Sequence, residues 1–370
     1  MFITESKFID NFNDTNETSY SEFIKKAKVK SKIKTYPLTE YLKEKDMKKG
    51  DFKQLYNHYK NKDSYLHNFF TYSMKIPDVL TIVEPPMKTR MNNNENTHYK
   101  NVIRNMHYKD ILKNTQSGFN NSSYLKVLED FYNKEILDYN LVIPSALEYI
   151  NNNQIGSVFS SLYFRASIMN PYLVYSLNKS IFKGKRIFTP TLGWTSYCYG
   201  FLECSEVEEY VGTDVIPSVC SKTKKFANKY YSDKKCDIFC VPSESLLLDK
   251  SFIKKYANHF DVVFFSPPYY KLEIYKGGKQ SVSEYKSYEE WLHEYWENTL
   301  QLIKLVLING GTLCYILSGY GSNLQHDLVQ DMNSITAKYF RHFKTINMNN
   351  QTSNKRHRET NEQIFIFKNV

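Results

Sequence analysis

The order of apolar and polar positions divides the chain into two parts. From about residue 180, short β-branched and aromatic runs alternate with amphipathic stretches, a pattern typical of strands and helices in a parallel sheet. Strands are expected at residues 185–189, 209–214, 236–241, 261–265 and 310–317, and a closing hairpin at residues 343–348 and 363–368. This alternation predicts an α/β fold with a doubly wound, largely parallel sheet.

The longest amphipathic stretch covers residues 288–307. Its apolar side chains recur at three- and four-residue steps, as on one face of a helix; they are Leu292, Tyr295, Trp296, Leu300, Ile303 and Leu307. Asn309-Gly310-Gly311 follows and is expected to stop this helix, because glycine readily adopts the left-handed conformation found after a helix.

Residues 1–155 follow a different pattern. They are polar and rich in Asn and Lys, with helical spacing in pieces such as Ser21–Lys26 and Tyr124–Tyr132, and residues 84–96 are expected to form a loop. We therefore predict a mostly helical accessory or target-recognition region over residues 1–155, followed by an α/β domain over residues 156–370.

The strongest chemical signal follows the fourth expected strand. Residues 262–265 are all apolar, and Ser266-Pro-Pro-Tyr269 comes directly after them. Two prolines must end the strand because neither donates a ladder hydrogen bond, so this turn lies at the carboxyl edge of the sheet, where open α/β sheets bind ligands. A rigid turn with a hydroxyl, a carbonyl and an aromatic ring suits a planar, amino-bearing substrate such as a nucleobase. The alternative is a plain turn with an aromatic plug.

Charge and composition narrow the class of partner. The formal net charge of +10 favours a polyanion, most simply nucleic acid, although an AT-rich genome, such as that of some viruses, would also enrich Lys, Asn and Tyr. The six cysteines form no CxxC pair, so we expect reduced thiols and no metal site. No apolar run reaches membrane length and no signal peptide is evident, which predicts a soluble, intracellular protein in the cytoplasm or nucleoplasm.

The turn and its flanks resemble a known family. Ser266-Pro-Pro-Tyr269, followed by Glu273, Tyr275, Gln280-Ser281 and Trp291, is similar to the catalytic region of S-adenosylmethionine-dependent amino methyltransferases, in particular phage and viral members that modify DNA. The resemblance covers roughly residues 160–370. It implies a Rossmann-like fold with a seven-stranded, mostly parallel sheet whose last strand is antiparallel.

The resemblance also implies a reaction. S-adenosylmethionine would donate a methyl group to the exocyclic amino nitrogen of adenine or cytosine, most simply in DNA, with RNA as an alternative. The rivals are a catalytically degenerate subunit that only binds nucleic acid and a methyltransferase acting on protein or a small molecule. No metal is implied, and a homodimer or a partner subunit is compatible with the sequence.

Roles in catalysis carry over to the turn itself. By resemblance, the Ser266 hydroxyl and the Pro267 carbonyl accept the two amino hydrogens of the base. Pro268 holds the turn rigid, Tyr269 stacks on a base that has left the helix, and Tyr270 contacts the nucleic acid.

The expected cofactor loop follows the first strand. Thr189-Pro190 and Gly193-Trp194 are similar to the family's loop in which a strand turns into a helix. Gly193 would let the backbone approach the cofactor. The sequence departs from the family twice, since Thr189 stands in place of an acid and Thr195 in place of a second glycine.

Other candidates follow the neighbouring strands. Asp214 is expected to contact the cofactor's ribose, or else to cap the helix that starts at Pro217. Ser243 or Glu244 would accept from the amino group of its adenine, or cap the next helix. Asn170, with Pro171, is similar to the family's helix motif that closes over the methionine part.

A basic segment separates the last two strands. Lys355, Arg356 and Arg358 are expected either to hold phosphates beside the target base or to form a solvated hairpin tip.

Overall fold

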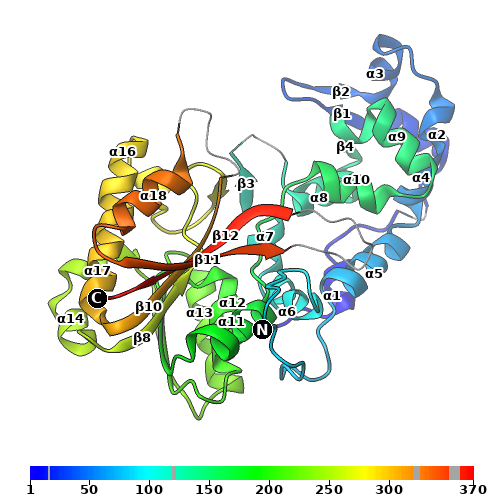
Figure 1. Ribbon diagram of the computed structural model, residues 1–370. Helices are drawn as coiled ribbons and strands as arrows, with labels where there is room; N and C mark the ends of the chain where they lie inside the picture. Colours follow the sequence, from blue (N-terminus) through cyan, green and yellow to red (C-terminus); the bar gives the residue numbers. More distant parts are fainter. Residues whose placement is uncertain (16, 119–121, 320–325, 350–358) are drawn as a thin grey trace. The chain divides into compact units, whose positions relative to one another are not determined.

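The computed structural model describes residues 1–15, 17–118, 122–319, 326–349 and 359–370, and these residues form two units (Figure 1). The first, called here the sheet unit, comprises Met1, Ile76–His107 and Ser167–Val370. The second, called the accessory unit, comprises Phe2–Lys75 and Tyr108–Ala166. Within the described part of the chain, no helix is long and apolar enough to span a bilayer.

A seven-stranded sheet organises the sheet unit. Its strand order is β11-β12-β10-β8-β5-β6-β7. The strands are β5 (Arg186–Thr189), β6 (Glu209–Thr213), β7 (Lys235–Phe239), β8 (Phe260–Phe265), β10 (Leu307–Ser318), β11 (Arg341–Asn349) and β12 (Glu359–Lys368). Only β12 runs antiparallel to its neighbours, β10 and β11. The predicted Rossmann-like fold, with an antiparallel last strand, is therefore confirmed.

Helices cover both faces of this sheet. Those of the sheet unit are α6 (His98–Met106), α11 (Pro171–Leu177), α12 (Ser196–Leu202), α13 (Pro217–Tyr230), α14 (Lys250–Tyr256), α15 (Ser281–Glu284), α16 (Tyr288–Glu290), α17 (Asn298–Val306) and α18 (Leu328–Thr336). A short 3₁₀ turn occurs at Ser243–Leu248 and a tight turn of left-handed residues at Gly193–Thr195. π-Helical turns occur at Asn178–Phe182 and Trp291–Glu297, and a short strand, β9, at Glu273–Tyr275. In Figure 1, α11, α12 and α13 lie on one side of the sheet, and α14, α17 and α18 on the other.

Strand β8 forms the centre of the core. Val262, Val263, Phe264 and Phe265 are all at most 1% exposed, because β5 and β10 flank the strand and helices cover both of its faces. Burying each of these side chains contributes about 1.5–3 kcal/mol to folding. The strand therefore gives the turn that follows it a rigid base.

The long amphipathic stretch forms a helix, but it ends earlier than predicted. The helix runs through α16, a π-helical segment and α17, and stops at Val306. The predicted stop at Asn309-Gly310-Gly311 is wrong because β10 already starts at Leu307, which pairs with Phe260. Gly310 instead lies inside β10 at φ +75°, where the register with β8 shifts.

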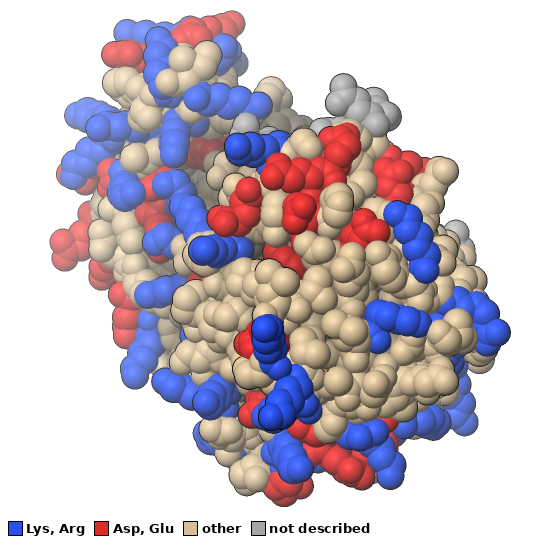
Figure 2. Space-filling model, turned by 90° about the vertical axis from the view of Figure 1, so that its left-hand side faces the viewer, with Lys and Arg blue, Asp and Glu red and all other residues tan. Residues whose placement is uncertain are grey.

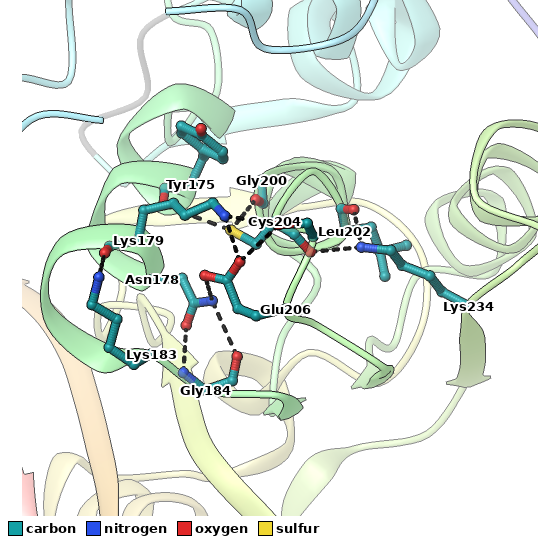
Figure 3. A network of polar contacts seen from close by, with 11 residues as sticks. Tyr175, Asn178, Lys179, Lys183, Gly184, Gly200, Leu202, Cys204, Glu206 and Lys234 are labelled. Atoms are coloured by element: carbon teal, nitrogen blue, oxygen red, sulfur yellow. Dashed lines mark hydrogen bonds and ion pairs between the residues drawn. The ribbon is translucent and has the colours of Figure 1, made fainter. Parts of the chain in front are cut away.

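A polar network fixes both ends of the segment that runs from β5 to α12 (Figure 3). The Asn178 side chain exchanges two hydrogen bonds with the backbone of Gly184, just before β5, at 3.0 and 3.2 Å. Lys179 donates to Glu206 at 2.5 Å. The Lys234 ammonium donates to the carbonyls of Leu202 and Cys204, at 2.7 and 2.6 Å, and so satisfies backbone acceptors at the end of α12.

The accessory unit is mostly helical. It contains α1 (Glu5–Ile9), α2 (Tyr20–Lys26), α3 (Leu38–Glu44), α4 (Lys53–Lys60), α5 (Lys62–Ser73), α7 (Tyr108–Leu112), α8 (Tyr124–Lys134), α9 (Pro144–Asn151) and α10 (Ile155–Leu162), with 3₁₀ turns at Lys49–Phe52 and Tyr139–Val142. Its strands are β1 (Lys28–Lys30), β2 (Thr35–Pro37), β3 (Thr115–Ser117) and β4 (Ile136–Asp138), and β2, β1 and β4 form a small sheet. Stacked rings such as Phe69 on Tyr124, 5.0 Å apart, build its core.

The two units do not follow the predicted division at residue 155. Ile76–His107 belongs to the sheet unit because its polar and aromatic groups are bonded there. The Asn170 N–H donates to the Asn93 side chain at 2.7 Å, and the Tyr172 hydroxyl donates to the Pro85 carbonyl at 2.6 Å. Residues 84–96 nevertheless contain no helix and no strand longer than a single bridge, as the sequence predicts.

Candidate active site

A cavity of about 520 Å³ opens at the carboxyl edge of the parallel strands, within the sheet unit. The segments that follow β5, β6, β7 and β8 all line it. The predicted site residues in its wall are Pro190, Gly193, Trp194, Asp214, Ser243, Glu244, Ser266, Pro267, Pro268 and Tyr269. Four loops that are far apart in the sequence therefore meet at one place, as expected of ligand sites in open α/β sheets.

Two hydrogen bonds fix the serine of the turn after β8. The Ser266 N–H donates to the hydroxyl of Tyr197 at 3.1 Å. The Ser266 hydroxyl donates its only proton to the carbonyl of Ile316, on the neighbouring strand β10, at 3.2 Å. Because that proton is committed, the Ser266 Oγ lone pairs remain available as hydrogen-bond acceptors toward the cavity.

Tyr269 completes the wall beside this serine. Its side chain is half-buried, and burial raises the pKa of its phenol well above the ordinary value. The ring is therefore neutral at physiological pH and offers the cavity an aromatic surface.

The loop after β5 has an unusual backbone. Gly193, Trp194 and Thr195 adopt φ values of +51°, +60° and +77° in succession, in the left-handed region that favours glycine. A Cβ atom at Gly193 would lie 2.3 Å from the ring of Tyr197, so only glycine fits there. Tyr197 thus packs under this loop while its hydroxyl accepts from the Ser266 N–H, which couples the loop after β5 to the turn after β8.

Thr195 stands where the family that the sequence resembles has a second glycine, and two side chains bond its hydroxyl. Its buried hydroxyl lies 2.6 Å from the Thr223 hydroxyl and 2.9 Å from His107 Nε2. Burial lowers the pKa of His107 well below its usual value, so the imidazole is neutral. These bonds offset the strain of a β-branched residue at positive φ.

Thr189 and Asn170 do not reach the cavity wall. Thr189 is fully buried, and its hydroxyl lies 2.6 Å from that of Tyr210. Asn170 is also fully buried and caps α11, accepting from the Tyr172 N–H at 3.0 Å. The three residues before it, Ser167–Met169, line the cavity instead.

Asp214 lies directly after β6 and joins two loops. Its Oδ2 accepts from the Leu192 N–H at 3.3 Å, and its Oδ1 accepts from the Ile216 N–H at 3.0 Å. The helix α13 begins with Ile216 as its N-cap and has no side-chain cap, so Asp214 does not cap it. Burial raises the pKa of Asp214 to about 6, which leaves the carboxyl near its titration point at neutral pH.

The loop after β7 contributes a second acid. Glu244 Oε1 accepts from the Tyr285 hydroxyl at 3.0 Å, and burial raises the pKa of Glu244. Ser243 donates to Glu244 Oε2 at 3.4 Å and is buried. The pair starts a 3₁₀ turn without a side-chain cap, so neither residue caps it.

The structure adds residues that the sequence analysis did not assign to the site. Glu273, Tyr295 and Glu362 also line the cavity. Glu273 lies within the flank that resembles the family, so its position was a usable signal. Tyr295 occupies the apolar face of the long helix, and Glu362 pairs with Ser318 across β10 and β12, so tertiary packing alone brings these two to the site.

The predicted nucleic-acid contacts, Tyr270 and the basic segment before β12, do not lie in the cavity wall that the structure describes. The ring of Tyr270 packs against Tyr288 and Trp291, with centroids 5.3 and 5.8 Å apart, and does not line the cavity. Lys355, Arg356 and Arg358 lie outside the described residues.

No family model and no curated protein matches this chain. Solved methyltransferase structures share part of its fold. The N-methyltransferase NodS from Bradyrhizobium japonicum WM9, crystallised with S-adenosyl-L-homocysteine, is 11% identical over 53% of this chain and 83% of its own, with a TM-score of 0.35. TrmN from Thermus thermophilus is 11% identical over 55% of this chain and 49% of its own, with a TM-score of 0.36. Likenesses of this size concern the fold alone, so the fold assignment rests on the strand order described above.

Proposed function

We propose that this protein transfers a methyl group from S-adenosylmethionine to an exocyclic amino nitrogen of adenine or cytosine in a nucleic acid. One observation carries the proposal: the loop after β5 and the turn after β8 line the same cavity. By resemblance, these segments hold the cofactor and the target base. The cavity volume of about 520 Å³ lies within the range of small-molecule sites.

An unsatisfied hydroxyl in the cavity wall supports a polar ligand. Tyr295 is 3% exposed, and its Oη has no hydrogen-bond partner among the described residues. Buried polar groups are nearly always hydrogen-bonded, and a bound molecule with polar atoms would satisfy this one. In the proposal, Asp214 accepts from the cofactor's ribose, Ser243 and Glu244 accept from its adenine, and the backbone at Gly193-Trp194 approaches its methionine part.

Glu273 takes the place of the acid missing at Thr189. Its carboxylate accepts from the Ser167 hydroxyl at 2.9 Å, and so lies beside the segment that leads into Asn170-Pro171. By resemblance, that segment closes over the methionine part of the cofactor. Glu273 is therefore our candidate partner for the cofactor's ammonium group.

The protein's own groups favour attack by a poor nucleophile. An exocyclic amino nitrogen shares its lone pair with the ring, and acceptors for both of its hydrogens promote a tetrahedral nitrogen. Ser266 Oγ is suited to this role because its proton is donated to Ile316. The Pro267 carbonyl is the second acceptor, and S-adenosylmethionine supplies the electrophilic methyl group. Much of the rate would then come from positioning.

The nucleic-acid substrate is supported by charge and by the aromatic wall. Tyr269 offers a surface for a base that has left its stack. The net charge of +10 favours a polyanion, although Figure 2 shows basic and acidic side chains interspersed over the visible face. DNA is the proposed target and RNA the alternative, while Lys355, Arg356 and Arg358 remain predicted phosphate contacts.

Transfer of a tritiated methyl group onto unmethylated DNA and RNA tests the proposal. We expect labelling by the parent protein and a loss of about 100-fold or more in kcat for Ser266→Ala, the scale seen when one preorganised polar group is removed. Ser232→Ala, an exposed serine in the loop before β7, is the matched control and should label like the parent. Equal labelling by Ser266→Ala would refute the role assigned to the turn.

A non-catalytic nucleic-acid-binding subunit is the second candidate. The observation that favours it is Thr189, which stands where the family that the sequence resembles has an acid. Its hydroxyl bonds Tyr210 and does not reach the cavity. Calorimetry with S-adenosylmethionine separates the two functions. If millimolar S-adenosylmethionine gives no heat of binding and no thermal stabilisation, the non-catalytic subunit is favoured. The proposed enzymatic function would then fail for this chain.

A further inference from the structure

The accessory unit carries a hairpin with an ordered tip. Strands β1 and β2 pair in antiparallel register, with Val29 opposite Tyr36. Ser31 closes the tip: its hydroxyl donates to the Lys34 carbonyl at 2.8 Å and accepts from the Lys34 N–H at 3.1 Å. Val29 is fully buried and anchors the hairpin to the unit. The hairpin therefore presents its side chains on a fixed backbone.

The hairpin carries four lysines, of which Lys28, Lys32 and Lys34 are exposed and Lys30 is partly exposed. Lys28, Lys30, Lys32 and Lys34 alternate along it, and no acidic residue occurs between Glu22 and Glu40. Across the described residues, none of these four lysines forms an ion pair with a carboxylate. Like charges so close together repel one another, and an external polyanion would neutralise them.

An apolar side chain stands at the centre of this charge. Ile33 lies between Lys32 and Lys34 and is 94% exposed. The Lys34 ammonium rests 4.3 Å from the ring centroid of Tyr36, which holds it on one side of the tip. Proteins that enter the minor groove combine such features, since cations contact phosphates while an apolar side chain wedges between base steps.

We propose that residues 28–36 form a DNA-binding hairpin, in which the four lysines contact phosphates of a duplex and Ile33 enters the minor groove. The proposal rests on the proposed nucleic-acid substrate and names an element that holds it. It assigns to the accessory unit a role in substrate binding that is independent of base methylation.

Duplex binding by the full-length protein at several salt concentrations tests the hairpin. Fluorescence anisotropy with a labelled DNA duplex gives the dissociation constant at each concentration. Each lost phosphate contact lowers the slope of log affinity against log salt by about 0.9, so Lys32→Gln with Lys34→Gln should lower it by about 1.8. Ile33→Ser should weaken binding without changing the slope, because it removes no charge.

A second lysine pair provides the matched control. Lys53 and Lys60 are exposed on α4 of the same unit, and Lys53→Gln with Lys60→Gln removes the same charge. We expect this control to keep the parental slope. If the hairpin and control variants lose the same slope, or neither loses any, the hairpin proposal is overturned. Unchanged melting temperatures exclude unfolding as the cause of a loss.

The outcomes separate this proposal from the proposed function. Methyl transfer to DNA together with parental binding by the hairpin variants would overturn the hairpin and leave the function standing. Duplex binding that depends on the hairpin, without methyl transfer, would support the hairpin and overturn the proposed function. Vesicles of anionic lipid form a further arm: if the hairpin variants lose binding to vesicles but not to duplex, the hairpin is a lipid-binding element and the proposal fails.

Discussion

At the scale of single residues, the site contains two acids with different expected partners. Asp214 bonds the backbone of Leu192 and Ile216, whereas Glu273 bonds the Ser167 side chain. Both face the same cavity. Ligands that contain or lack the methionine part of the cofactor should therefore distinguish the two acids.

Glu273→Gln should weaken binding of S-adenosylhomocysteine but not of 5′-methylthioadenosine, which lacks the ammonium and carboxylate groups. Asp214→Asn should weaken both, since both ligands contain the ribose. Calorimetric titration of the two variants with the two ligands measures this. A loss of methylthioadenosine binding in Glu273→Gln would contradict the assignment of Glu273 to the ammonium group.

The titration of Asp214 should have opposite effects on binding and on stability. Burial raises its pKa to about 6, so below that pH the carboxyl is mostly protonated and offers ribose hydroxyls no charge. We expect affinity for S-adenosylhomocysteine to fall up to about 10-fold for each pH unit below that value. The unfolded pKa is about 3.9, so stability due to this group is complete below it and declines as pH rises through 6.

Calorimetry from about pH 4 to 8, with and without ligand, checks both trends. Asp214→Asn should flatten both the dependence of affinity on pH and the matching part of the dependence of the melting temperature. A parental pH profile in this variant would assign the titration to another group.

At the scale of structural elements, the sequence predicted the strands and the turn after β8 because their signals are local. Apolar runs identify β8, and two prolines fix its end. The stop of the long helix was mispredicted because pairing of Leu307 with Phe260 decides it, and that contact spans 47 residues. Glu362 was not predicted for the same reason: only strand pairing with Ser318, 44 residues earlier in the chain, brings it to the cavity. Local patterns predict elements, whereas the site also needs contacts between distant ones.

The loop after β5 provides a prediction at this scale. Thr195→Val keeps the side-chain shape and the strain at φ +77° but removes both hydroxyl bonds, to His107 and Thr223. Thr195→Gly removes the same bonds and also relieves the strain. We therefore expect Thr195→Val to be the more destabilising change, by about 1–3 kcal/mol. Urea unfolding of both variants measures this difference, and equal free energies of unfolding would contradict the expected order.

At the scale of the whole molecule, the chain passes between the two units at residues 75–76, 107–108 and 166–167. The sequence pattern did not predict this path because residues 76–107 share the polar composition of the segments around them. Their membership in the sheet unit depends on bonds such as that from Asn170 to Asn93.

A pair of truncated proteins tests this division. A fragment of residues 156–370 lacks residues 76–107, so we expect it to aggregate or to lack a cooperative thermal transition. Joining residues 76–107 to residues 167–370 through a flexible linker should restore the transition and binding of S-adenosylhomocysteine. Folding of the 156–370 fragment with parental ligand affinity would show that residues 76–107 are dispensable.

The order in which segments of the two units follow one another along the chain has a consequence for synthesis on the ribosome. His107 leaves the ribosome 88 residues before its hydrogen-bond partner Thr195. The accessory unit is complete once Ala166 has emerged, so it can fold first. At that moment residues 76–107 still lack their partners in residues 167–370, which have not yet emerged. Nascent chains arrested once Ala166 has left the ribosomal exit tunnel should therefore contain a protease-resistant accessory unit and a protease-sensitive segment at residues 76–107.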